Sequence, residues 1–270
     1  MLTASLKSNY YDIYPPYGTL KDVENLVVEL KKREMHLVMD LVVNHTSDQV
    51  SFLHQSRPPK TPKLKQPQCP WFKESASSKT DPKRLWYIWR PPKYDAKGVR
   101  HPPNNWACIL DEANSAWTWD PKTEEYFLTL FTPYQPDLNW ECKAVREEVY
   151  NIMRFWIDKG AKGFRMDVIN LISKDLSFQD AAETRPGKTY QAAMDHFANG
   201  PKLKEYLQEM KREVLSKHDL LTVGEMPFLS DPDRIIDLVS AEEGALNMIF
   251  TFDLMSLDEV PGESKFSHKQ

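Results

Sequence analysis

An arginine and an aspartate share one face of a short apolar segment, and this pair is the first sign of chemistry in the sequence. If the segment is a β-strand, Phe164, Met166 and Val168 lie on one face, and Arg165 and Asp167 lie on the other. Burying two charged groups is costly unless they satisfy each other or meet a ligand. A structural ion pair and a catalytic site both fit this segment when it is considered alone.

Two further acidic residues follow the same pattern in other apolar segments. Glu225 ends the next such segment along the chain, and Asp40 lies in an earlier one, 37–43, which Asn44 and His45 follow. If these segments are parallel strands, their carboxyl ends meet at one edge of a sheet. Retaining glycosidases use two carboxylates about 5 to 5.5 Å apart, one to attack the anomeric carbon and the other to donate a proton and later activate water. The sequence therefore predicts a carboxylate site at this edge.

Helical and strand-like segments alternate along the chain, which predicts a parallel α/β sheet. Helical spacing of apolar residues marks segments 19–34, with Thr19 as a candidate N-cap, 145–157, with Gly160 just past its end, 203–214 and, more briefly, 235–239. The strand-like runs are 37–43, 163–169, 220–224 and 247–252.

A long segment of different composition separates the first two predicted strands. Residues 46–139 hold 13 of the 20 prolines, six of the eight tryptophans and a single glycine, Gly98. Proline-rich segments are often disordered, but the aromatic side chains here supply enough apolar surface for a small core. We predict an ordered, loop-rich subdomain in which most tryptophans fill the core, although a sugar-stacking wall is an alternative role for them.

Composition and charge exclude several classes of protein. The 270 residues are 41% hydrophobic and 27% charged, with a formal charge of −4 that is interspersed along the chain, so we expect a globular protein that binds no nucleic acid. No apolar stretch reaches the roughly 20 residues of a membrane helix, and Met1–Asn9 lacks the apolar core of a signal peptide, which favours a cytoplasmic location without membrane contact. Cys69, Cys108 and Cys142 are odd in number and lack metal-ligand spacing, so we expect free thiols.

Three segments resemble, in order, consecutive signature regions of glycoside hydrolase family 13, the α-amylase superfamily. They are Asp40-Leu-Val-Val-Asn44-His45, Gly163-Phe-Arg-Met-Asp167 and Gly224-Glu225. In addition, Gln135-Pro-Asp-Leu-Asn139 is similar to the motif that marks the oligo-1,6-glucosidase subgroup. The resemblance covers nearly the whole chain.

The resemblance implies a role for each residue of the predicted site. It makes Asp167 the nucleophile, Glu225 the general acid/base and Arg165 the residue that orients the nucleophile. It also implies no cofactor and no metal. The residues implied to line the subsite for the non-reducing glucose are Asp40, His45, Phe131 and Gln135.

Val168, directly after the implied nucleophile, resembles family members that prefer α-1,6 linkages. This favours isomaltose-like substrates over maltose, although a valine that simply packs in a strand is the alternative. The activity implied is that of a retaining exo-α-glucosidase acting on small oligosaccharides. A transglycosylase of the same superfamily would use the same residues and remains an alternative.

The fold implied is part of a TIM (β/α)8 barrel, about its third to sixth strands. Residues 1–45 and 140–270 would form the barrel part, and residues 46–139 an insertion, similar to domain B of the family, after the third barrel strand. No Asn-His-Asp motif, which supplies the family's third carboxylate, follows Glu225. An open half barrel would have two unpaired strand edges, so we also expect poor autonomous stability, and a catalytically inactive fragment is a further alternative.

Overall fold

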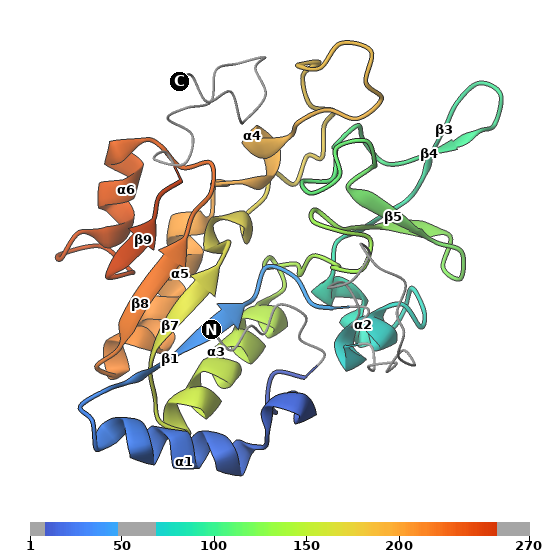
Figure 1. Cartoon of the computed structure of the whole chain (residues 1–270). Coiled ribbons are helices and arrows are strands. Elements are labelled where there is room, and N and C mark those ends of the chain that lie inside the picture. Colours follow the sequence, from blue (N-terminus) through green and yellow to red (C-terminus); the bar gives the residue numbers. More distant parts are fainter. Residues whose placement is uncertain (1–8, 48–68, 253–270) are drawn as a thin grey trace, which may run out of the picture.

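A parallel sheet forms the centre of the computed structural model, which describes residues 9–47 and 69–252 (Figure 1). Its strands are arranged in the order in which they occur along the chain, as in a section of a barrel wall. In that order they are β1 (Leu37–Val42), β7 (Ala161–Asp167), β8 (Leu221–Glu225) and β9 (Met248–Phe250). This arrangement confirms the parallel sheet predicted from the sequence.

The connecting helices form where the sequence predicts them. Thr19 begins α1 with a capping box, in which its side chain accepts from the Asp22 amide while the Asp22 carboxylate accepts from the Thr19 amide. Gly160 follows the helix that ends at Asp158. It adopts a φ of 98°, which favours glycine, and the chain turns there into β7. The helices are α1 (Leu20–Lys31), α5 (Leu203–Glu213), α6 (Pro232–Val239) and α3 (Lys143–Asp158).

One large apolar cluster joins the helices to the sheet. It includes Leu41 of β1, Phe164 and Met166 of β7, Ile152 of α3 and Leu207 of α5, each at most 1% exposed. Within the described residues, β1 and β9 each pair with one strand only, which agrees with the two open edges expected for part of a barrel.

The described part of the insertion, residues 69–139, is built on antiparallel pairs. Strands β2 (Trp89–Arg90), β6 (Glu125–Leu128) and β5 (Trp117–Asp120) form one sheet in this order, and β3 (Lys93–Tyr94) pairs with β4 (Arg100–His101). Two short helices precede them, α2 (Pro70–Ser75) and the 3-10 helix η2 (Pro82–Trp86). Figure 1 shows these elements to one side of the parallel sheet.

A second apolar cluster fills part of the insertion and buries two of its six tryptophans, while Trp89 is buried in the first cluster. The predicted core role agrees with the burial of these three. Trp106 and Trp117 are 0% and 3% exposed. The segment after β7 contributes to the same cluster through Leu171 of the 3-10 helix η3 (Ile169–Leu171) and Phe197 of α4 (Met194–Phe197). The second cluster therefore bridges the insertion and the chain that follows β7.

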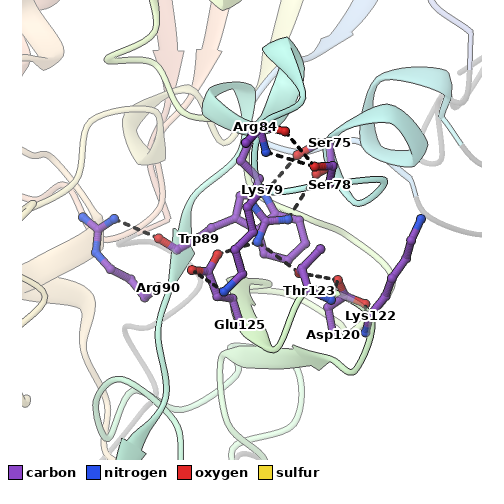
Figure 2. A network of polar contacts seen from close by, with 11 residues as sticks. Ser75, Ser78, Lys79, Arg84, Trp89, Arg90, Asp120, Lys122, Thr123 and Glu125 are labelled. Carbon is purple, nitrogen blue, oxygen red and sulfur yellow. Dashed lines mark hydrogen bonds and ion pairs between the residues drawn. The ribbon is translucent and has the colours of Figure 1, made fainter.

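Arg84 holds the insertion together through a buried polar network (Figure 2). Its guanidinium donates to the Ser75 carbonyl at 3.1 Å, to Thr123 Oγ1 at 3.1 Å and to Glu125 Oε2 at 2.5 Å. The same guanidinium stacks 3.4 Å above the Trp89 ring. One cation thus fixes α2, η2 and the β5–β6 hairpin to one another.

The structure corrects one prediction about the second strand. The strand ends at Asp167 rather than continuing to residue 169, and Val168 lies outside it with φ 36° and ψ 44°. Val168 therefore does not share a strand face with Phe164 and Met166, which pack in the first cluster, but belongs to the second cluster. The physical reason is a reversal of the backbone that starts η3, where the Val168 carbonyl accepts from the Leu171 amide at 2.9 Å.

Three further predictions concern the cysteines, membrane helices and the division of the chain into parts. Cys69, Cys108 and Cys142 are free thiols, as expected. No helix among the described residues is long and apolar enough to cross a membrane. The division of the chain at residues 45/46 and 139/140 stays a prediction.

Candidate active site

Arg165 gathers the three predicted carboxylates at the carboxyl end of the parallel sheet. Its Nη1 lies 2.7 Å from Asp40 Oδ1 and 2.6 Å from Asp167 Oδ1, and its Nη2 contacts Glu225 Oε2. Asp40 pairs with Arg165 across β1 and β7, and Glu225 ends β8 on the other side of β7. Parallel pairing in this register brings three carboxylates that are 58 to 185 positions apart along the chain around one guanidinium.

The electrostatics of this cluster act most clearly on Glu225 and Arg165. Burial raises the pKa of Glu225, and the neighbouring Asp167 carboxylate raises it further, while Arg165 opposes both. Burial also opposes the charge on Arg165, but the hydrogen bond to Asp40 and the charges of Asp167 and Glu225 outweigh it and raise the pKa of Arg165. The arrangement favours a permanent cation beside Asp167 and a carboxyl at Glu225 that holds its proton more tightly than usual.

His45 contacts Phe131 and Gln135, which both belong to the last part of the insertion. The His45 and Phe131 rings are 5.1 Å apart between centroids, and Gln135 Nε2 donates to His45 Nε2 at 2.9 Å. Burial lowers the pKa of His45, against the opposing charges of Asp137 and Asp167, so the ring is neutral at pH 7. The structure thus brings these three predicted site residues together, with the Asp167 charge close enough to act on the imidazole.

A buried ion pair that the sequence analysis missed supports this group. Lys174 Nζ lies 3.1 Å from Asp137 Oδ1 and donates to Asn44 Oδ1 at 3.0 Å and to the Leu171 carbonyl at 2.7 Å. Asp137 also accepts from Asn44 Nδ2 and from the Leu130 amide, both at 3.0 Å. A lone lysine shortly after the mainly apolar segment 168–172 was the available sequence signal for this pair.

The entry and exit of the insertion are hydrogen-bonded to each other beside the site. The Leu138 amide donates to the Asn44 carbonyl at 2.9 Å, and the Thr46 amide donates to the Pro136 carbonyl at 3.0 Å. Tyr10, another residue that the sequence analysis did not single out, donates from its hydroxyl to the Val42 carbonyl at 3.0 Å. Burial raises the pKa of Tyr10, with smaller contributions from Cys69 and Asp167, so it stays a donor.

Val168 touches the site through its backbone. Its amide donates to Glu225 Oε2 at 3.2 Å, while its side chain is 8% exposed and packs in the second cluster. Phe131 packs against the same cluster. Among the described residues, no group of three or more His, Cys, Asp or Glu side chains is arranged to hold a metal ion.

Comparisons with known proteins identify the family that the chain matches. The family model for the catalytic domain of alpha amylase matches residues 6–269. The chain is 48% identical over 259 residues to an alpha-glucosidase of Schizosaccharomyces pombe, covering 96% of this chain and 41% of that protein. It is 46% identical over 255 residues to an oligo-1,6-glucosidase of Parageobacillus thermoglucosidasius, covering 94% of this chain and 40% of that protein.

A solved structure resembles the chain over the same extent. The crystal structure of trehalose-6-phosphate hydrolase from Bacillus licheniformis superposes with a TM-score of 0.77 and 40% identity, covering 96% of this chain and 40% of that one. The chain thus spans about two fifths of the length of each of these relatives.

Proposed function

Because the chain belongs to the family of α-amylase catalytic domains, we propose that it carries the nucleophile and the acid/base of a retaining exo-α-glucosidase. The fold is part of a TIM (β/α)8 barrel, of which the described residues provide four strands. The substrate class proposed is a short oligosaccharide with a terminal α-linked glucose. This class is the one that the names of the two curated relatives describe.

The observation that carries the proposal is the sharing of Arg165 by Asp40, Asp167 and Glu225 on adjacent strands. A nucleophile must be charged and an acid must hold its proton at the same pH, so the two carboxyls of a retaining glycosidase need different surroundings. Here Asp167 lies on the cation, whereas burial and the Asp167 charge raise the pKa of Glu225. The two environments therefore suit the two roles.

In the first chemical step, the Asp167 carboxylate attacks the anomeric carbon of the terminal glucose. The bond between that carbon and the glycosidic oxygen breaks, and the Glu225 carboxyl gives its proton to the departing oxygen. In the second step, the Glu225 carboxylate takes a proton from water, and the hydroxide attacks the anomeric carbon and releases Asp167. Two inversions give glucose with the configuration of the substrate.

We propose that the remaining site residues bind the terminal glucose. Asp40 and Gln135 offer polar groups to its hydroxyls, the neutral His45 can donate or accept one hydrogen bond, and Phe131 offers an apolar ring face. Arg165 positions Asp167 through their 2.6 Å contact. No metal or cofactor has a part in this mechanism.

The side chain of Val168 is proposed to favour α-1,6 over α-1,4 linkages, so that isomaltose is preferred to maltose. A transglycosylase would differ only in the second step, where a sugar hydroxyl replaces water. The free thiols suit the reducing cytoplasm, which is the location we propose.

The test is release of nitrophenol from p-nitrophenyl α-glucoside by the purified chain, beside its Asp167→Asn and Glu225→Gln variants. Both variants should lose activity, and azide should rescue a substrate with a good leaving group in Glu225→Gln only. Assays on isomaltose and maltose test the linkage, and product analysis with added sugar acceptor separates hydrolysis from transfer. NMR of the first-formed anomer tests retention.

Each outcome has a definite meaning for the proposal. A folded chain without activity would support the alternative of a catalytically inactive fragment. Activity that survives in Asp167→Asn would overturn the assignment of the nucleophile.

A further inference from the structure

Val168 has a backbone conformation that its side chain disfavours. Six non-glycine residues among those described have a positive φ, and Val168 is the only β-branched one of them. A β-branched side chain at φ 36° is sterically strained, so surrounding contacts must hold it there.

The contacts that hold Val168 come from the second cluster. Its side chain is buried to 8% exposure together with Ile88 and Leu130 of the insertion and with Leu171 and Phe178 of the segment after β7. The 2.9 Å hydrogen bond from the Leu171 amide to the Val168 carbonyl fixes the other side of the same peptide. The apolar neighbours of Val168 in this cluster thus lie outside the four strands of the parallel sheet.

This conformation directs the Val168 amide at the acid/base. The amide donates to Glu225 Oε2 at 3.2 Å, and the same oxygen contacts Arg165 Nη2. Had β7 continued through Val168, this amide would have taken a position in the strand ladder instead of turning toward Glu225. The donor exists because β7 stops at Asp167, one residue before Val168.

We propose that Val168 is a positioning residue, whose side chain is anchored in the second cluster so that its left-handed backbone holds the Glu225 carboxylate in place. The inference rests on the proposed function of Glu225 as acid/base, and it is separate from any effect of the Val168 side chain on linkage. It makes the packing of the insertion a determinant of where the acid/base lies.

Three substitutions separate this role from a simple effect of side-chain size. Val168→Ile keeps the anchor, so the titration of Glu225 should match that of the parent. Val168→Ala removes the anchor but keeps the steric penalty at positive φ, so the backbone should relax and the amide should leave Glu225. Val168→Gly also removes the anchor, but glycine adopts positive φ readily, so the amide should stay with Glu225 more often than in Val168→Ala.

The readout is the titration of the Glu225 carboxyl by NMR of the chain labelled with 13C at glutamate side chains, assigned by comparison with Glu225→Gln. An N–H donor stabilises the carboxylate, so loss of the donor raises the Glu225 pKa. The charged groups that face this carboxyl are Arg165 and Asp167 of β7, and Asp40 of β1 acts through Arg165; all three are unchanged in the variants. Phe197→Leu trims a different member of the same cluster and is the matched control.

The expected order of the Glu225 midpoint is Val168→Ala highest, Val168→Gly intermediate, and Val168→Ile and Phe197→Leu equal to the parent. If the midpoint rises steadily as the side chain shrinks, with glycine highest, or if it is the same in all variants, the positioning role is overturned. If the expected order is seen in a chain that hydrolyses no glucoside, the positioning role stands and the proposed function fails. In an active chain, the alkaline limb of kcat/KM should move in the same order.

Discussion

Lys174 and Asp137 form an ion pair of 3.1 Å in which the side chains are 2% and 0% exposed. Lys174 comes from the segment after β7, and Asp137 comes from the end of the insertion. Asn44, which follows β1, bonds to both of them. The pair and Asn44 therefore join the end of β1, the end of the insertion and the segment after β7. Asn44 is next to His45 in the chain, so this junction adjoins the site.

Replacing Lys174 with methionine should destabilise the protein strongly, because Asp137 would remain buried without its cation. Removal of one partner of a buried pair costs about 3 to 5 kcal/mol. Urea unfolding followed by circular dichroism measures the change. Lys204→Met is the matched control, since the Lys204–Asp237 pair is 3.2 Å long but about half exposed, and it should cost about 1 kcal/mol or less. Equal losses in the two variants would contradict a structural role for the buried pair.

Replacing Arg165 with glutamine should reduce kcat/KM by about 10²-fold or more, because Asp167 and Glu225 would lose the cation between them. Steady-state hydrolysis of p-nitrophenyl α-glucoside measures the effect. Arg146→Gln tests the loss of an arginine as such, since Arg146 pairs with Glu209 at 2.8 Å on the helices outside the site, and its kcat/KM should stay close to that of the parent. A similar fall in both variants would attribute the effect to folding rather than to the site.

Glu225 should make stability depend on pH in a defined direction. Because burial and Asp167 raise its pKa in the folded state, the folded protein binds a proton that the unfolded chain has already released at the same pH. Stability therefore falls as pH rises from the unfolded pKa of glutamate through the higher folded pKa. Glu225→Gln has no such loss, so its stability relative to the parent should increase with pH in thermal unfolding series. A constant difference across the series would show that the folded pKa is not raised.

Replacing Arg84 with methionine should loosen the insertion, because Glu125 and Thr123 lose a buried donor and α2 loses its link to the β5–β6 hairpin. The expected cost is about 3 kcal/mol or more. Hydrogen exchange measured by mass spectrometry should be faster in the variant than in the parent. This increase should be larger in residues 70–128 than in the parallel sheet. Arg100→Met removes an exposed arginine that stacks 3.8 Å above Trp119 in the same insertion, and its exchange pattern should match that of the parent.

Gly160→Ala should be more harmful than Gly187→Ala. Both glycines have positive φ, 98° and 75°, so both substitutions strain the backbone by about 1 kcal/mol. A Cβ at Gly160 would also lie 2.6 Å from Val27 Cγ1 of α1, whereas a Cβ at Gly187 would meet nothing within 4 Å. The free energies of unfolding of the two variants, measured by chemical denaturation, should differ by the cost of that clash. Equal values would contradict the close packing of α1 against the end of α3.

Local patterns determined much of the fold. The apolar spacing and the Thr19 cap placed α1, Gly160 marked the end of α3, and alternation of helices and strands predicted the parallel sheet. Element ends differ by up to three residues: β8 was predicted to begin at 220 and begins at Leu221, whereas α1 was predicted to end at 34 and ends at Lys31. These features follow from interactions within a few residues of one another, which a sequence displays directly.

The candidate site could be predicted as a set of residues but not as an arrangement. The positions of Asp167 and Glu225 at strand ends, and of Asp40 near the end of an earlier strand, are evident from the sequence, because parallel strands bring their carboxyl ends to one edge. The choice of Arg165 as the shared partner of all three depends on the register between β1, β7 and β8, which is a tertiary property.

Tertiary structure alone decided the features that support the site. Lys174 and Asp137 are 37 positions apart, and neither has a local pattern that names the other as its partner. Val168 belongs to a strand by propensity, yet it turns out of β7 because packing in the second cluster and the bond to Leu171 outweigh that preference. The sequence by itself determined which elements form and which groups can do chemistry; long-range packing decided which charges share a partner and where the amide beside Glu225 points.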